Sequence, residues 1–162
     1  MRAVALAKER VPGIEFRFMG GGSHLARVLA LSKELGVEDR VHYLGFVPFD
    51  QMVEEILLAD VCVVAVEKNP YSVLVHTNKM FEYIALEKPV VLSRLDAVAA
   101  FLPDDAALYF EPGNHQDLAR QLETAAQDPA AAAARTLRAG ERYREHRWEN
   151  EKRLYLDRYR AV

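Results

Sequence analysis

The sequence predicts an α/β fold in which a mostly parallel sheet is covered by helices on both faces. Three observations predict it. Short apolar runs with strand character alternate with longer runs of helical periodicity along the 162 residues, which is the pattern of βαβ units. Glycine and proline separate these runs. Residues 61–66 are apolar at every position, as in a strand covered on both faces. We therefore expect about five parallel strands with right-handed crossovers, in a single domain over residues 1–162.

Helix and strand signals divide the first 66 residues into six elements. Val11-Pro12-Gly13 ends the first helix, because proline has no backbone N–H. Gly36 suits the carboxyl end of the second helix, and Asp50 caps the third. The predicted elements are helices over residues 2–10, 25–35 and 51–58, and strands over residues 14–19, 41–44 and 61–66.

The rest of the chain continues the alternation and then becomes helical. The turn Pro112-Gly113-Asn114 leads into a helix, and Pro129 begins another, because the first helical position tolerates proline. The predicted elements are strands over residues 89–93 and 107–110, and helices over residues 78–86, 96–101, about 115–125, from 129 onward and 138–158. The carboxy-terminal helices thus occupy about residues 129–162.

Composition excludes several classes of protein. The net charge is -3, whereas a nucleic-acid binder normally presents a basic face. Cys62 is the sole cysteine and lies inside the apolar run, so no disulfide can form within the chain and we expect a reducing, cytoplasmic setting. No stretch approaches the roughly 20 apolar residues of a membrane span. No His, Cys, Asp or Glu residues have metal-ligand spacing with supporting context, so we expect no metal site.

Ligands of parallel α/β sheets bind at the carboxyl ends of the strands. Four loops of this chain follow predicted strands and are expected to meet at that edge. They are residues 20–23, 45–49, 67–77 and 93–96. Gly20, Gly21 and Gly22 open the first loop, which by itself indicates only a tight turn.

The densest signal is the helix predicted over residues 78–86. Thr77 or Asn78 can cap this helix, so its free N–H groups and positive dipole end face the loop and suit a phosphate. Lys79 lies in the first turn, and Glu82 lies one turn beyond Asn78, where its carboxylate can accept from two ribose hydroxyls. The alternative is a surface ion pair between Lys79 and Glu82 worth a few tenths of a kcal/mol, roughly as for other exposed pairs. The pattern alone slightly favours this alternative.

These residues also resemble a known family. Residues 78–91, with Gly45-Phe46-Val47-Pro48 before them and Phe110-Glu111-Pro112-Gly113 after them, are similar to the carboxy-terminal domain of retaining GT-B glycosyltransferases of group 1, also called family 4. The resemblance covers residues 14–122. It implies a Rossmann-like, three-layer α/β/α domain, the half of a two-domain enzyme that binds the nucleotide-sugar donor. It further implies transfer of a hexose or N-acetylhexosamine, from a UDP-sugar in our expectation, to a glycan or lipid-linked acceptor such as cell-envelope polysaccharide.

The resemblance also assigns roles to residues. It implies that Glu82 binds the ribose, that Lys79 and the amides around Thr77 and Asn78 lie near the diphosphate, and that the loop with Phe46 and Val47 holds the base. The first glutamate of the family's glutamate pair falls at Leu74, which cannot bind sugar hydroxyls. Tyr71, Ser72 or His76 are therefore expected to contact the sugar. The expected donor-binding set is Gly20, Gly21, Gly22, Phe46, Val47, Tyr71, Ser72, His76, Thr77, Asn78, Lys79 and Glu82.

Other expectations concern what these residues do not supply. We expect no catalytic residue or general base within the chain, and no cofactor besides the donor. In the family this domain begins with a strand, then an arginine and a lysine that bind the diphosphate, and an acceptor-binding domain precedes it. The sequence here starts in the following helix, so we expect that strand and the acceptor domain, or a second chain, to complete the enzyme. We therefore expect the chain alone to be inactive. Peripheral membrane association of the whole enzyme and formation of a homodimer are two further expectations.

Three alternatives remain open at this point. A nucleotide-sugar epimerase of the same two-domain architecture fits the same residues. A non-catalytic Rossmann-like interaction module keeps the fold without the ligand. A dinucleotide-binding oxidoreductase is disfavoured, because the glycines do not form the G-x-G-x-x-G pattern with an acidic residue after the second strand.

Overall fold

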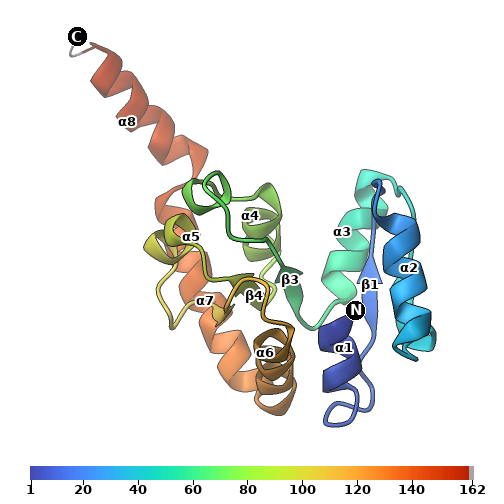
Figure 1. Ribbon diagram of the computed structural model, residues 1–162. Helices are drawn as coiled ribbons and strands as arrows, with labels where there is room; N and C mark the ends of the chain where they lie inside the picture. Colours follow the sequence, from blue (N-terminus) through green and yellow to red (C-terminus); the bar gives the residue numbers. More distant parts are fainter. Residues whose placement is uncertain (161–162) are drawn as a thin grey trace.

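The computed structural model describes residues 1–160 (Figure 1). Helices and strands alternate along the chain, as the sequence predicts. The first elements are α1 (Arg2–Ala7), β1 (Phe16–Phe18), α2 (Leu25–Glu34), the 3-10 helix η1 (Glu38–Arg40), β2 (Val41–Tyr43), α3 (Phe49–Leu58) and β3 (Cys62–Val64). The remaining elements are the 3-10 helix η2 (Ser72–Leu74), α4 (Asn78–Ala85), β4 (Val90–Ser93), α5 (Asp96–Phe101), β5 (Leu108–Phe110), α6 (His115–Gln127), α7 (Pro129–Glu145) and α8 (Trp148–Arg160).

The strands are all parallel, but they form two sheets and not the single sheet expected from the sequence. One sheet pairs β1 with β2, with Phe16 opposite Val41. The other has the order β3-β4-β5, with Cys62 opposite Val90. The alternation of helices and strands predicts parallel pairing correctly, yet it cannot show whether neighbouring strands actually meet.

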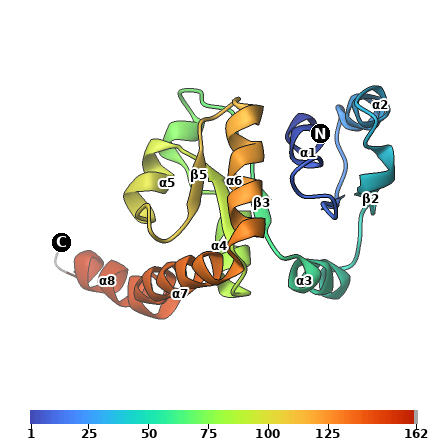
Figure 2. The same cartoon turned by 90° about the horizontal axis from the view of Figure 1, so that it is seen from below.

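Helices cover the larger sheet on both faces. On one face, Leu92 and Tyr109 pack with buried residues of α4 and α5, such as Ile84 and Val98. On the other face, Val91 and the other outward residues of β4 and β5 pack on α6. This alternation follows from the two-residue period of a strand. The result is the expected three-layer arrangement of helix, sheet and helix (Figure 2).

The apolar run of residues 61–66 packs on both faces of the sheet, as expected. Cys62 and Val64 are buried with the residues that face α4 and α5, and Val61 and Val63 pack with Val91 and α6 on the opposite face. Ala65, just beyond β3, is exposed. β4 is buried at all four positions, whereas β3 lies at the edge of its sheet and Val63 is half-buried.

The amino-terminal part of the chain contacts the larger sheet through helices. Ala3 and Ala7 of α1 pack against Ala119 of α6, where small side chains allow a close approach. Arg10 and Glu123 form an ion pair at 2.8 Å across the same contact. These contacts place β1 and β2 beside the larger sheet (Figure 2).

The carboxy-terminal helices begin at Pro129 as predicted, but the long helix expected over residues 138–158 is divided. α7 ends at Glu145, and the side-chain amide of Asn150 donates to the carbonyls of Arg144 and Glu145 at 3.1 and 3.2 Å. Helical periodicity in the sequence continues through residues 145–148, so it does not reveal the break between α7 and α8. At that break, Asn150 bonds to the last carbonyls of α7. α8 then projects from the body and has no buried residue (Figure 1). In the part of the chain that the structure describes, no helix is long and apolar enough to cross a membrane.

Candidate functional site

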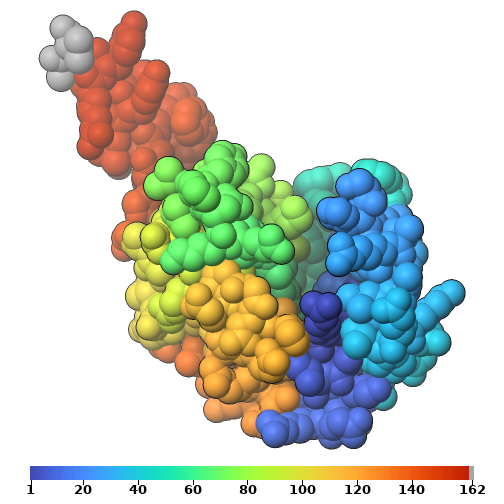
Figure 3. All heavy atoms as spheres, viewed as in Figure 1, coloured from blue at the N-terminus to red at the C-terminus, as the bar shows by residue number. Residues whose placement is uncertain are grey.

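The loops that follow the strands meet at one edge of the molecule. The loops after β1, β2 and β3 lie at the upper edge in Figure 1. Figure 3 shows a hollow there, between the green segment after β3 and the blue segment after β1. This is the edge at which ligands of parallel sheets bind, and it carries the candidate residues.

The glycine turn and the loop after β2 are bonded to one another. The Gly20 N–H donates to the Gly45 carbonyl at 2.7 Å, and the Tyr43 hydroxyl donates to the Gly20 carbonyl at 2.7 Å. Gly20 has a φ of +102°, a conformation that side chains disfavour. The ring of Phe46 lies over Gly21 and is otherwise 86% exposed. The candidates from two separate loops therefore form one surface.

The loop after β3 is held by its own hydrogen bonds. The Ser72 hydroxyl accepts from the Asn69 N–H at 2.9 Å and donates to the Glu67 carbonyl at 2.7 Å. The Asn69 side chain accepts from the N–H groups of Tyr71 and Ser72, both at 2.9 Å. Ser72 is buried, while Tyr71 and Leu74 are exposed. Ser72 thus shapes the loop, and Tyr71 is the polar candidate that the loop presents to solvent.

His76 joins this loop to α5. Its Nε2 atom lies 2.9 Å from the Ala97 carbonyl, and its ring packs against those of Phe81 and Phe101 at centroid distances of 5.7 and 5.4 Å. The side chain remains exposed. It is therefore positioned by three contacts and still reachable by a ligand.

The amino end of α4 carries the remaining candidates. Thr77 precedes the helix in an extended conformation, and its side chain makes no capping hydrogen bond. The first N–H groups of a helix have no partner within the helix. Asn78, Lys79 and Glu82 are exposed, and no ion pair joins Lys79 to Glu82 among residues 1–160. The surface pair that the pattern slightly favoured is thus not formed.

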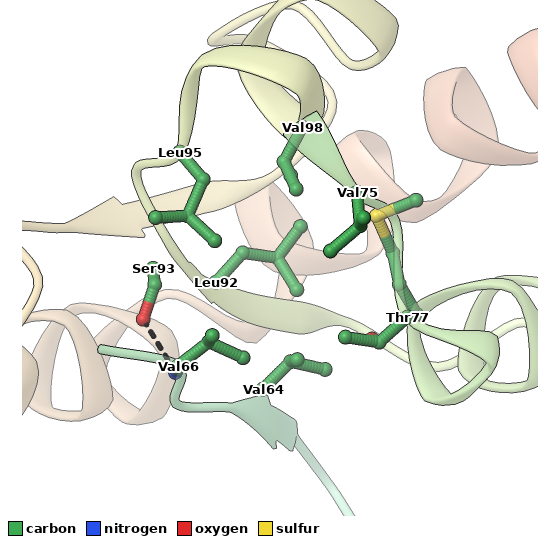
Figure 4. A pocket seen from close by; sticks show the side chains of 9 residues that line it. Val64, Val66, Val75, Thr77, Leu92, Ser93, Leu95 and Val98 are labelled. Carbon is green, nitrogen blue, oxygen red and sulfur yellow. Dashed lines mark hydrogen bonds between the residues drawn. The ribbon is translucent and has the colours of Figure 1, made fainter. Parts of the chain in front are cut away.

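Below this helix end lies a small, mostly apolar cavity of about 20 Å³ (Figure 4). Its lining residues are Val64, Val66, Val75, Thr77, Met80, Leu92, Ser93, Leu95 and Val98. The Val66 N–H donates to the Ser93 hydroxyl at 2.8 Å beside it. A cavity of this size has room for no more than about one water molecule. The cavity therefore has no room for a larger ligand.

Two buried groups, Cys62 and Tyr83, lie where β3 begins and near the carboxyl end of α4, away from the loops that follow the strands. Burial raises the pKa of the Cys62 thiol to about 11 and outweighs the opposing effect of Lys88. Burial likewise raises the pKa of the Tyr83 hydroxyl to about 12, with further contributions from Cys62 and Glu82. A thiol with such a pKa is almost entirely protonated at neutral pH and is a poor nucleophile.

Several residues that build this edge were not singled out from the sequence. Tyr43 holds the glycine turn, Asn69 shapes the loop after β3, and Lys68 lies 3.6 Å from Asp96 across two of the loops. The Asn69-Pro70 pair is a turn signal that could have identified one of them. Tyr43 looks like any aromatic strand residue, so no local signal could have identified it.

Comparisons with known proteins agree with this fold. The family model of glycosyl transferases group 1 matches residues 1–128. No curated protein matches the sequence.

Solved structures share the architecture at low sequence identity. Sucrose-phosphate synthase from Thermosynechococcus elongatus matches with a TM-score of 0.80 and 22% identity, over 99% of this chain and 42% of that one. HepE of Anabaena, in complex with UDP-glucose, matches with a TM-score of 0.78 and 19% identity, over 99% and 44%. The catalytic domain of cholesterol-α-glucosyltransferase from Helicobacter pylori gives 0.74 and 20%, over 90% and 87%.

The chain spans less than half the length of the first two of these structures. Its fold is the Rossmann-like α/β fold of GT-B proteins. Because the family model covers most of its residues, this chain belongs to the group 1 family of glycosyltransferases.

Proposed function

We propose that this chain binds the donor of a glycosyltransferase and holds a nucleotide diphosphate sugar during transfer to a glycan or lipid-linked acceptor. The amino end of α4 is the observation that carries the proposal. Its free N–H groups lie beside two exposed charged side chains, Lys79 and Glu82, that no ion pair joins. This end belongs to the edge at which the loops after the strands meet.

The chemistry of these groups matches the parts of the donor. The helix amides, the positive end of the helix dipole and Lys79 suit the diphosphate. The Glu82 carboxylate suits the vicinal hydroxyls of ribose, because charge-assisted hydrogen bonds are the strong ones. The surface formed by Gly20–Gly22, Phe46 and Val47 is left for the base, where glycine lets the backbone approach closely.

We assign the contacts with the sugar to the loop after β3. Tyr71 and His76 are the candidate polar side chains that this loop exposes, and Leu74 offers no hydrogen bond. Ser72 has its hydroxyl committed within the loop, so we assign it a supporting role. These contacts suit a hexose or an N-acetylhexosamine.

The proposed catalysis is electrostatic. When the bond from sugar to phosphate breaks, negative charge develops on the departing diphosphate, and preorganised donors at that position lower the barrier. The α4 amides and Lys79 supply such donors without a metal ion. We place the acceptor-binding groups outside these residues, so this chain by itself should turn donor over slowly or not at all.

We also propose which nucleotide the donor carries and where in the cell the transfer takes place. We favour UDP as the nucleotide, supported by HepE structures in complex with UDP and with UDP-glucose. We favour acceptors of cell-envelope polysaccharide synthesis on the cytoplasmic side, with peripheral membrane association of the whole enzyme.

The test is calorimetry of the chain with UDP, GDP and NAD. We expect UDP to bind, and Glu82→Ala to weaken it by about 10- to 100-fold, since hydrogen bonds to a charged group contribute about 1.5–3 kcal/mol. Glu54→Ala is the matched control, because Glu54 is an exposed glutamate on α3.

The outcomes separate the alternatives. Tighter binding of GDP would change the assigned base but keep the donor site. Binding of NAD alone would instead indicate a dinucleotide-binding oxidoreductase. If no nucleotide binds although the chain is folded, the proposed donor site is wrong for this chain.

A further inference from the structure

The ring of His76 is held in place although its side chain is exposed. His76 lies between η2 and α4, in a segment that contacts α5. Its ring meets that of Phe81 of α4 in a T-shaped arrangement and that of Phe101 of α5 at a tilt of 58°. Because two helices hold the plane of the ring, each of its two nitrogens has a defined direction.

The partner of one nitrogen determines where the proton of the neutral ring lies. Nε2 is 2.9 Å from the backbone carbonyl oxygen of Ala97. A carbonyl oxygen only accepts hydrogen bonds, so Nε2 must carry the proton and donate it. In a neutral imidazole the other nitrogen, Nδ1, is then an acceptor. Within residues 1–160 the His76 side chain forms the bond to Ala97 alone, so the lone pair of Nδ1 is left for a ligand.

The place of this acceptor in the chain matches one part of the proposed donor. His76 comes two residues before the first residue of α4, whose amides we assign, with Lys79, to the diphosphate. In a nucleotide diphosphate sugar, the sugar is joined directly to the second phosphate. A group on the loop beside these amides is therefore placed to contact the sugar.

The chemistry of the neighbouring groups makes an acceptor necessary. Sugar hydroxyls donate hydrogen bonds as well as accept them, whereas helix amides and the ammonium group of Lys79 can only donate. In the loop after β3, the side-chain oxygens of Asn69 and Ser72 already have partners within the loop. His76 Nδ1 is an acceptor whose direction is set before a ligand binds, and such preorganisation reduces the cost of binding.

We propose that Nδ1 of neutral His76 accepts a hydrogen bond from a hydroxyl of the donor sugar, and that the bond from Nε2 to Ala97 fixes this role. The inference rests on the proposed donor site and adds to it the atom that recognises the sugar. It makes His76 a specificity-determining residue, because the hydrogen bond distinguishes a nucleotide sugar from the free nucleotide. The opposite assignment is a protonated ring that donates from Nδ1 to a phosphate.

The first measurement is ¹⁵N NMR of the histidine rings in the labelled chain. It is made at about pH 7.5, where an ordinary histidine is mostly neutral, on the chain alone, with UDP and with UDP-glucose. We expect the proton of His76 to lie on Nε2 in the free chain. UDP-glucose, in contrast to UDP, should shift the Nδ1 signal in the direction of a hydrogen-bonded acceptor.

The second measurement separates the two nitrogens by substitution. The side-chain amide of His76→Gln can replace Nε2 and keep the bond to Ala97, but it leaves no acceptor at the position of Nδ1. The side-chain oxygen of His76→Asn replaces Nδ1 instead. Calorimetry gives the ratio of the affinity for UDP-glucose to that for UDP, and the same ratio for UDP-N-acetylglucosamine. We expect His76→Gln to lower the ratio by about 5-fold, as for one neutral hydrogen bond, and His76→Asn to lower it less.

The matched control is His146→Gln. His146 is also exposed and also packs against the ring of Phe101, at 5.2 Å, but it lies at the carboxyl end of α7. The ratio of affinities should therefore stay at the value of the parent. Thermal unfolding checks that each variant is folded, and the NMR measurement on the parent needs no variant.

Four results would overturn the inference. They are a proton on Nδ1 in the free chain, protonation of both nitrogens when UDP binds, a parental ratio in folded His76→Gln for both sugar nucleotides, and equal losses in the two His76 variants. If UDP itself does not bind, the proposed donor site and this inference fail together. If UDP binds and any of the four results is found, this inference alone fails.

Discussion

Gly21 lies directly beneath Phe46: a Cβ atom on Gly21 would be 2.7 Å from Phe46 Cε2. The contact joins the turn after β1 to the loop after β2. Real Cβ atoms essentially never approach another atom so closely, so a side chain at residue 21 would displace the exposed Phe46 ring from this position. The ring position therefore depends on the glycine, and the two loops form one surface.

We expect Gly21→Ala to displace the Phe46 ring and to weaken UDP binding by about 10-fold, while the melting temperature hardly changes because the ring is an exposed side chain. Calorimetry and thermal unfolding measure the two effects. Gly22→Ala is the control, because a Cβ there meets nothing within 4 Å. Equal affinity of the two variants would show that the ring position does not matter for binding.

Glu87 is expected to limit the stability of the fold. It has a φ of 57° and follows α4 at the position where the Lys88 N–H donates to the Tyr83 carbonyl at 2.9 Å. This is the helix ending in which glycine is preferred. We expect Glu87→Gly to raise the free energy of unfolding by about 0.5–1 kcal/mol. Chemical denaturation measures it.

The matched control for that prediction is Glu54→Gly in the interior of α3. It should lower the free energy of unfolding by about 1 kcal/mol. A loss of stability in both variants would contradict the strain assigned to Glu87.

The Arg17–Glu55 contact is expected to make stability depend on acid. Hydrogen bonds and charge from Arg17 outweigh desolvation and lower the pKa of Glu55 below 4.5. The ionised carboxylate therefore stabilises the fold above pH 4.5, and this contribution is lost as pH falls through the lower pKa of the folded state. Glu55→Gln should be less stable than the parent at pH 6.

The difference in the free energy of unfolding between Glu55→Gln and the parent should shrink below about pH 4. At that pH the parent has lost its ionised Arg17–Glu55 contact as well. Unfolding by urea at several pH values measures it, with Glu54→Gln as the control. A difference that stays constant with pH would mean that ionisation of Glu55 contributes nothing.

Cys62 is expected to resist thiol reagents in the folded protein. Burial raises its pKa from 9.0 to about 11, so at pH 8 the reactive thiolate should be about 100-fold scarcer than in the unfolded chain. The rate with a disulfide reagent, in buffer and in guanidinium, measures this. Rapid reaction of the native protein would show that the β3 edge opens readily.

Much of the fold follows from local pattern. The helices before residue 127 and all five strands are predicted near their observed positions, because two-residue and helical periods are properties of consecutive residues. Val61–Val66 shows the limit. Its composition indicates a buried strand, but the exposure of Ala65 depends on tertiary packing that composition does not reveal.

The site divides in the same way. Loops after strands, the start of α4 and a glycine turn were visible in the sequence, so the edge that carries Lys79 and Glu82 could be predicted, although the Thr77 side chain makes no capping hydrogen bond. The occupied hydroxyl of Ser72 and the anchoring of His76 to Ala97 could not, because their partners are set by how the loop folds back.

The sequence by itself determined the α/β class, the parallel direction of the strands and the edge on which the candidate residues gather, because each depends on short-range periodicity and chain order. Only the tertiary structure decided that β1 and β3 do not pair, that α7 ends at Glu145 and that Phe46 lies over Gly21. Those features depend on contacts between residues distant in the chain, whose geometry no local pattern encodes.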